Sequence, residues 1–170
     1  MSKNYDKPKY IDTKRSDSGD NEKKEQKIKY IKEMIETELF GVLATKGDTE
    51  CYTSLISFAC DDNFKTLVFA TPIKTKKYTM IEKNTNVSIL VDNRSSNKKS
   101  LNDIAAVTSL GQGRILEDKK EIQKWSKLLI DKHSYLDEFI SAETTAVVLV
   151  EISKYLYVSS FQETIEWSPS

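Results

Sequence analysis

The sequence has little of what most hydrolytic and metal-dependent sites require. It contains a single histidine, His133, and two cysteines, Cys51 and Cys60, among its 170 residues. One histidine cannot supply a His-based metal site and leaves almost no material for a nucleophilic triad. The cysteines lack any zinc or redox spacing, so we expect reduced, half-buried thiols, with a disulfide between them as the alternative. We expect no metal, and any chemistry must come mainly from a bound group.

Charge and hydropathy leave several classes of partner without support. Lysine plus arginine total 26, as do aspartate plus glutamate, so the formal net charge is zero. Such a chain lacks the basic surface that binds duplex nucleic acid or an anionic membrane. No run approaches the roughly 18–20 apolar residues of a membrane span, and the N-terminus has no apolar signal core. We therefore expect a soluble, cytoplasmic protein without nucleic-acid or membrane partners.

The first part of the chain has the composition of a disordered segment. Residues 1–26 are dense in Lys, Asp, Glu, Ser and Asn, and their sizeable apolar side chains are Tyr5, Tyr10 and Ile11. These three cannot offset the entropy that would be lost on ordering. We predict a disordered charged arm over 1–26 and a single domain over 27–170. Alternatively, the arm lies across a partner subunit and uses the three side chains as anchors.

The rest of the chain is dominated by short β-type runs separated by tight turns. Gly111 and Gly113 indicate a bulge or a close approach by another backbone. The last run is either one long strand or two strands that meet near Ser153. The first three runs follow one another in meander order, which implies antiparallel pairing. Six short strands, two or three helices and tight turns favour a mainly β (α+β) fold, a small antiparallel barrel with helices outside. The runs are residues 40–45, 51–59, 66–70, 87–91, 105–116 and 144–161.

Two amphipathic helices are expected to pack on this barrel. Residues 27–38 form the first, and Asp118 with Glu121 forms a capping box for the second. His133 falls near the end of the second helix, where a cation suits the helix dipole. Trp167, near the C-terminus, either covers a pocket or simply packs. The apolar stripes are Ile28, Ile31, Ile35 and Leu39 with Met34 beside them, and Ile122, Trp125, Leu128 and Leu129.

Residues 66–90 read as a strand, a loop, a short helix and a second strand. Pro72 stops the first strand because it cannot donate to a sheet ladder. Thr75 can act as the N-cap of the helix, and Asn84 ends it. Tyr78 and Ile81, three residues apart, are expected on the inner side of this helix.

The start of this short helix carries charge of the wrong sign. Lys74, Lys76 and Lys77 gather where unpaired N–H groups and the macrodipole already make the potential positive. A bound anion such as a phosphate would take hydrogen bonds from the helix N-terminus and compensate the lysines. The alternative is a solvated lysine cluster in a lysine-rich chain.

Small hydroxyl side chains interrupt the second β-type run. Thr53, Ser54 and Ser57 lie among Leu55 and Ile56, so the run alternates imperfectly. Such residues let a flat ligand approach the backbone closely and offer adaptable hydrogen bonds. The alternative, which the residues alone favour, is a strand whose polar face is only solvated.

Four motifs in this order resemble the flavin-binding split-barrel family related to pyridoxamine 5'-phosphate oxidase. They are Y-T-S-L-I-S-F at 52–58, L-V-F-A-T at 67–71, T-K-K-Y at 75–78 and N-x-x-V-S-I-L at 84–90. The family pattern is a strand ending in Thr, a short loop, then Ser/Thr-Arg/Lys-Lys heading a helix, an Asn-containing turn and an apolar strand. The resemblance covers about residues 27–167. It implies a six-stranded antiparallel split β-barrel with flanking helices.

The resemblance also implies flavin mononucleotide (FMN) bound at the interface of a homodimer. Family members hold the phosphate on the Thr/Lys/Lys segment, here Thr75, Lys76 and Lys77. Asn93 and Arg94 are implied to contact the flavin that the other subunit mainly holds. The isoalloxazine ring is implied to lie along two strands, on Thr53, Ser54, Leu55, Ile56, Ala70 and Thr71.

Two departures from the family bear on activity. Lys76 stands where an Arg is frequent, and a point charge replaces a bidentate fork there. The oxidase's C-terminal Arg-x-His has no counterpart after Phe161, so we do not assign that oxidase activity.

The leading hypothesis is an FMN-dependent oxidoreductase in which hydride transfer passes through the flavin N5. The donor could be a reduced nicotinamide or another small molecule, and no side chain is assigned as a catalytic acid or base. The second hypothesis is a non-catalytic flavin- or haem-binding carrier of the same fold. A third is a protein-interaction domain that presents the charged arm.

Overall fold

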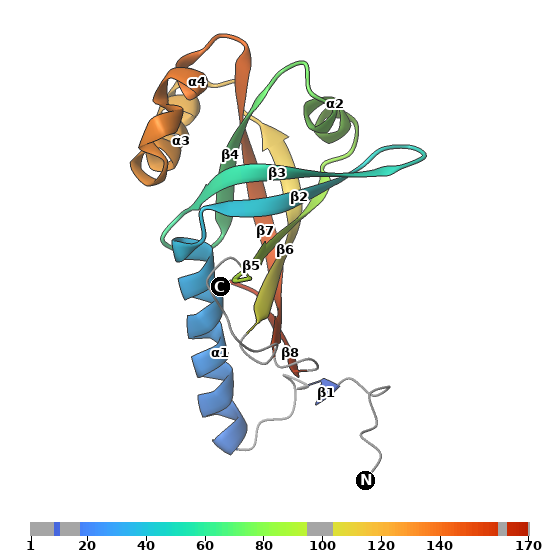
Figure 1. Cartoon of the computed structure of the whole chain (residues 1–170), viewed down its shortest axis with the longest axis vertical. Coiled ribbons are helices and arrows are strands. Elements are labelled where there is room, and N and C mark those ends of the chain that lie inside the picture. The colour runs from blue at the N-terminus through green and yellow to red at the C-terminus, as the bar shows by residue number, and fades with distance from the viewer. Residues whose placement is uncertain (1–8, 11–17, 95–103, 160–162, 170) are drawn as a thin grey trace.

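Figure 1 shows the computed structural model, which describes residues 9–10, 18–94, 104–159 and 163–169. The helices are α1 (Ser18–Thr37), α2 (Lys76–Lys83), α3 (Lys119–Lys132) and α4 (Asp137–Ser141), with a 3₁₀ turn η2 (Ser134–Leu136). The strands are β1 (Lys9–Tyr10), β2 (Phe40–Lys46), β3 (Cys51–Cys60), β4 (Thr66–Pro72), β5 (Asn86–Asp92), β6 (Ala105–Ile115), β7 (Thr145–Ser159) and β8 (Glu163–Trp167).

Six of the strands close into an antiparallel barrel. The strand order is β7-β4-β3-β2-β5-β6, and β6 pairs back onto β7. Beyond the residues that pair with β4, β7 continues outward and pairs with β8, which pairs in parallel with β1. The fold is mainly β with flanking helices, so the predicted six-stranded antiparallel barrel is confirmed. No helix in the described ranges is long and apolar enough to cross a membrane.

The core lies inside the barrel and under the helices on its outer face. α1 contributes Ile31, Met34 and Ile35 to the interior cluster, which also contains Phe58 and Tyr155. α3 and α4 cover β4 and β7 from outside, where a second cluster forms. Complete burial of a Val, Leu, Ile, Phe or Met side chain contributes about 1.5–3 kcal/mol to the free energy of unfolding. The second cluster contains Ala59, Val68, Leu116, Leu129, Ile140, Val147 and Leu149.

α1 differs from the sequence prediction at both ends. It begins at Ser18 rather than at residue 27, so the last part of the predicted arm is helical. The rest of that arm, apart from β1, lies outside the described residues. Leu39 was expected in the buried stripe but is 45% exposed. The physical reason is that α1 ends at Thr37, so Leu39 belongs to the connection into β2 and no longer follows helical periodicity.

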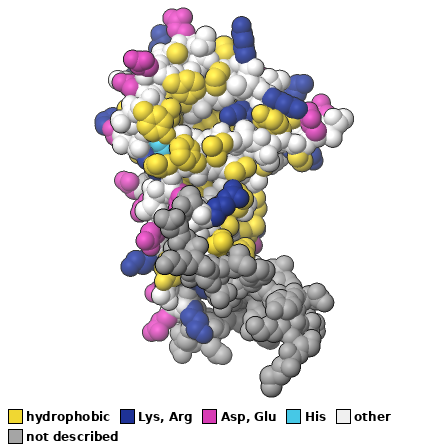
Figure 2. Space-filling model, in the orientation of Figure 1, with side chains coloured by type: hydrophobic (Ala, Val, Ile, Leu, Met, Phe, Trp, Pro, Cys, Tyr) yellow, Lys and Arg dark blue, Asp and Glu magenta, His cyan; other side chains and the backbone are white. Residues whose placement is uncertain are grey.

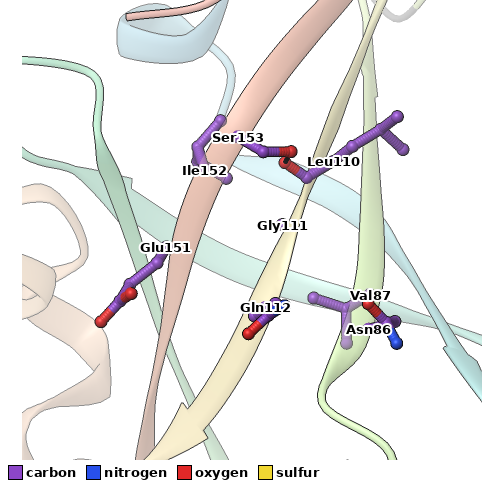
Figure 3. Close-up of a pocket in the computed structure, with 8 residues that line it drawn as sticks. All are labelled: Asn86, Val87, Leu110, Gly111, Gln112, Glu151, Ile152 and Ser153. Carbon is purple, nitrogen blue, oxygen red and sulfur yellow. Dashed lines mark hydrogen bonds between the residues drawn. The ribbon is translucent and has the colours of Figure 1, made fainter. Parts of the chain in front are cut away.

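β7 is one continuous strand with a bulge, as one of the two predicted alternatives had it. Its register with β6 passes from Leu110↔Lys154 to Gly111↔Ile152, which leaves Ser153 as the extra residue. A Cβ on Gly111 would lie 2.2 Å from the carbonyl oxygen of Glu151, so the predicted close backbone approach is also present. A hollow of about 510 Å³ lies beside this bulge. Figure 3 shows the residues of β5, β6 and β7 that line it. None of the predicted cofactor-binding residues lines it.

The two cysteines are free thiols, and Trp167 is a packing residue. Cys51 and Cys60 stand at opposite ends of β3 and are both free, so the alternative of a disulfide between them is wrong. Cys60 is partly buried, and burial raises the pKa of its thiol to about 12. Cys51 is exposed rather than half-buried. Trp167 packs on Tyr155 with ring centroids 5.2 Å apart, so it fills space in the core.

His133 is a buried neutral side chain and not the helix-end cation that we expected. It is the C-cap residue of α3 and is 0% exposed. Its Nε2 lies 2.9 Å from the carbonyl oxygen of Phe58, and its Nδ1 lies 3.3 Å from the Tyr135 hydroxyl. Because a carbonyl can only accept, Nε2 carries the proton and Nδ1 accepts from Tyr135. Burial, reinforced by the nearby charge of Lys132, lowers the pKa of His133 below its ordinary value.

This burial predicts a loss of stability in mild acid. The pKa of His133 is lowered from 6.5 in the folded state, so below about pH 6.5 the unfolded chain binds the extra proton and the free energy of unfolding falls. His133→Gln keeps an N–H donor for Phe58 but cannot titrate. Urea unfolding at about pH 7.5 and 5.5 should show a smaller pH-dependent loss in this variant than in the native chain. An equal loss in both would contradict the assignment.

Candidate functional site

The barrel is split between β3 and β4. These strands pair only at Phe58–Phe69, Ala59–Val68 and Cys60–Leu67. Beyond that point residues 51–57 of β3 pair with β2 alone, and residues 70–72 of β4 pair with β7 alone. One edge of β3 therefore carries backbone N–H and C=O groups without a sheet partner in the described structure. Such an edge can hydrogen-bond a ligand.

The predicted N-cap of α2 is present. Thr75 Oγ1 accepts from the backbone N–H of Tyr78 at 3.4 Å, and Asn84 is the C-cap. The same hydroxyl lies 2.9 Å from Thr71 Oγ1, which ties the end of β4 to the start of the helix. The backbone N–H groups of Lys76 and Lys77 occupy the first two helical positions and have no acceptor within the helix. They form a potential anion-binding end.

One of the two residues predicted on the inner side of α2 is not the residue that is buried there. Ile81 is buried as expected, at 1% exposed, but its buried neighbour is Met80 at 7% exposed. Tyr78 is only half-buried. Met80 faces inward, where its sulfur accepts a hydrogen bond from the buried Thr45 hydroxyl at 3.2 Å.

The lysines at the start of α2 are not equivalent. Lys76 Nζ lies 2.8 Å from Glu50 Oε1 and 5.2 Å from the ring centre of Tyr52. Lys77 is half-buried, burial lowers the pKa of its ammonium, and no carboxylate in the described ranges lies within ion-pair distance of it. Lys74 is exposed. The protein thus already compensates Lys76, whereas Lys74 and Lys77 have no carboxylate partner among the described residues.

The predicted ring-binding residues of β3 divide between the two faces of the strand. Ser54 pairs with the core residue Leu43 and faces inward with Ile56, whereas Thr53 and Leu55 face outward. Leu55 is 65% exposed. Ser54 Oγ is buried and has no hydrogen-bond partner. What the four residues share is the unpaired backbone edge, which lies across the split from Ala70 and Thr71.

Asn93 and Arg94 are not brought near α2 within one chain. Both residues follow the C-terminal end of β5. α2 comes just before the other end of that strand, which begins at Asn86. Asn93 Oδ1 accepts from the backbone N–H of Ala105 at 3.0 Å. Arg94 Nε lies 3.1 Å from Asp92 Oδ1. Their expected role concerned a flavin held by a second subunit, and that role remains a prediction.

Glu50 and Tyr52 are site residues that sequence reasoning missed. Both touch Lys76 from the β2–β3 hairpin, and only the folded register brings that hairpin to α2. Figure 2 shows this face of the molecule hollowed between the β2–β3 hairpin and the part of the barrel that carries the helices. Hydrophobic side chains line both rims of the hollow, and basic side chains stand around it. The site is therefore an open hollow with apolar rims and basic side chains around it.

The barrel is open along part of one strand pair, β3 and β4, and the N-terminus of α2 lies at the opening. This arrangement is that of the split-barrel class. A family model described as pyridoxamine 5'-phosphate oxidase matches residues 28–159. The chain belongs to that family. No curated protein matches the chain.

Several solved structures share the fold. A protein related to general stress protein 26, of the pyridoxinephosphate oxidase family, from Clostridium acetobutylicum is 14% identical, with a TM-score of 0.67 over 85% of this chain and 95% of that one. A FAD-binding protein from Mesorhizobium loti is 16% identical, with a TM-score of 0.61 over 74% and 89%. A heme binding protein from Mycobacterium smegmatis is 15% identical, with a TM-score of 0.68 over 78% of this chain but 54% of that one. At these identities the likeness establishes the fold alone.

Proposed function

We propose that this protein binds FMN in the split between β3 and β4 and acts as an oxidoreductase. The observation that carries the proposal is the placement of the cationic N-terminus of α2 at the open end of an unpaired strand edge. Family membership and a FAD-binding structural neighbour support a flavin. The orphaned Ser54 hydroxyl is a buried polar group that a ligand would satisfy.

The residues present fit an FMN molecule. Its phosphate would accept from the backbone N–H groups of Lys76 and Lys77, with the two ammonium groups neutralising its charge. The Thr75 hydroxyl would also donate to the phosphate, in place of the Pro72 carbonyl to which it donates at 2.9 Å. The unpaired edge over residues 53–56 would hold the ring, with Ala70 and Thr71 facing it across the split. When bound, the flavin supplies hydride transfer at its N5 atom. The protein supplies orientation, exclusion of water and the hydrogen bonds around the ring.

The histidine geometry favours a flavin over a haem. His133 is the chain's one histidine, and both of its ring nitrogens are engaged, with Phe58 and with Tyr135. Axial ligation by this residue would break both contacts and would have to reach a side chain that is 0% exposed. The haem alternative would therefore depend on a ligand of another type.

We further propose that a second copy of the chain completes the site. An apolar row crosses the outer face of three neighbouring strands, in the register Leu55↔Val42↔Leu90, and no described helix covers it. Phe40, on the same face, is 47% exposed. Burying this face in a homodimer would place residues of one subunit beside the split of the other. Sedimentation velocity should then give twice the mass of the 19.5 kDa chain.

A titration with FMN tests the cofactor assignment. Purified protein should quench flavin fluorescence to saturation at one FMN per chain and should shift the flavin absorption bands. If the protein is isolated without flavin and a titration shows no saturable binding, the proposal fails. A red sample with a Soret band would favour the haem alternative.

Rapid mixing with a reduced nicotinamide separates an oxidoreductase from a carrier. In the FMN complex of an oxidoreductase that accepts this donor, the flavin absorption should bleach rapidly. In a carrier the flavin should hardly change on the same timescale, although it remains bound. The remaining hypothesis, an interaction domain, would be supported if deleting residues 1–17, which precede α1, abolished a partner but left flavin binding intact.

A further inference from the structure

Lys76 is engaged before any phosphate arrives. Its Nζ lies 2.8 Å from Glu50 Oε1, and both side chains are about half-exposed, at 47% and 54%. The ring of Tyr52 lies 5.2 Å from the same ammonium. Lys76 is therefore held over the β2–β3 hairpin and would have to exchange one anion for another in order to bind a phosphate.

The hairpin is held against α2, so this contact does not depend on a freely moving loop. The backbone N–H of Gly47 donates to the Glu50 carbonyl at 2.8 Å and closes the turn. A Cβ on Gly47 would lie 3.0 Å from Met80 Cε, so the turn packs closely on the helix. The Thr45 hydroxyl adds a hydrogen bond to Met80 Sδ at 3.2 Å. Glu50 is thereby kept within reach of the first turn of α2.

Lys77 provides the internal comparison. It is the next residue on the same turn, yet no carboxylate in the described part of the chain pairs with it. The two lysines therefore have different starting points for phosphate binding. Lys77 gains a partner, whereas Lys76 replaces a carboxylate by a phosphate.

We propose that Glu50 is an internal counter-anion that competes with the FMN phosphate for Lys76 and so sets the affinity of the site for phosphorylated flavins. This inference rests on the proposed function. A carboxylate brings one negative charge and a phosphate nearly two, so the phosphate displaces it, but the net gain is reduced by the ion pair that is lost. Glu50 also repels the phosphate through space. Riboflavin, which lacks the phosphate, does not compete with Glu50.

Glu50→Gln tests this with FMN and riboflavin as the two probes. In fluorescence titrations at low ionic strength, the variant should bind FMN about two- to fivefold more tightly than the native chain, and riboflavin equally. Glu166→Gln is the matched control, because it removes a comparably exposed Lys–Glu pair, with Lys154 at 2.6 Å, that is remote from α2. It should leave both affinities unchanged. In a Lys76→Ala background the gain from Glu50→Gln should shrink.

The other outcomes overturn the inference. Weaker FMN binding by Glu50→Gln would mean that Glu50 positions Lys76 for the phosphate, and unchanged binding would mean that the pair does not compete. A parallel gain for riboflavin would place the effect on the ring or on the fold. Native protein that binds FMN without responding to Glu50→Gln overturns this inference alone. Failure of the native protein to bind FMN overturns the proposed function as well.

Discussion

Replacing Lys76 and Lys77 together by alanine should weaken FMN binding by about 2–4 kcal/mol, or roughly 30- to 1,000-fold. Each ammonium makes a charge-assisted contact with the phosphate in a partly desolvated site, and their backbone N–H groups alone cannot replace that charge. Riboflavin affinity should change little, because the ring contacts lie on β3. Fluorescence titration with both flavins measures the difference.

The fold should tolerate this double substitution. Removing cations from a helix N-terminus relieves repulsion of a few tenths of a kcal/mol each, while the loss of the exposed Lys76–Glu50 pair costs a similar amount. Lys119→Ala with Lys120→Ala is the matched control, since these exposed lysines hold the same positions at the start of α3. That pair should leave FMN affinity unchanged. Equal losses in the two double variants, or unfolding that parallels the loss of binding, would show that the α2 lysines are not phosphate ligands.

Gly111→Ala should have the largest effect on stability, about 3 kcal/mol or more. The new methyl group would stand 2.2 Å from the carbonyl oxygen of Glu151, and a backbone atom cannot move aside as a side-chain end can. The contact lies where β6 and β7 close the barrel beside the bulge at Ser153. Relief would require the two strands to separate locally.

Gly113→Ala is the control for the same strand. Its methyl group would meet Ile81 Cγ2 at 3.2 Å, which is the end of a side chain and can give way. Urea unfolding of the two variants should show a large loss for Gly111→Ala and a loss below about 1 kcal/mol for Gly113→Ala. If the two losses were equal, or if Gly111→Ala were tolerated, the close approach would be wrong.

Sequence reasoning was most successful where a local signal determines structure. The β-type run over residues 87–91 marked β5, and the Thr75 and Asp118 side chains marked two helix starts, because capping depends on neighbouring residues. Gly111 indicated the close approach, since only a missing Cβ allows it. The barrel therefore followed from period, turns and caps.

Features that depend on distant partners could not be predicted in this way. The first turns of α1 are charged and present no apolar stripe, so nothing distinguished them from a disordered arm. His133 is buried with its Nε2 hydrogen-bonded to the Phe58 carbonyl, which is far away in the sequence. Lys76 pairs with Glu50, which only the folded β2–β3 hairpin brings close to α2. The excess positive charge at α2 predicted an anion site there, and that site stays a prediction; the charge pattern alone could not show that the Glu50 carboxylate already compensates Lys76.

The most direct test of the account follows backbone amide resonances in a ¹H–¹⁵N correlation spectrum while FMN is added. We expect saturable shifts at the amides of Lys76 and Lys77 and along residues 53–56, with the helix amides unaffected by riboflavin. Shifts confined to α3 and α4, or identical responses of the α2 amides to both flavins, would contradict phosphate binding at the N-terminus of α2.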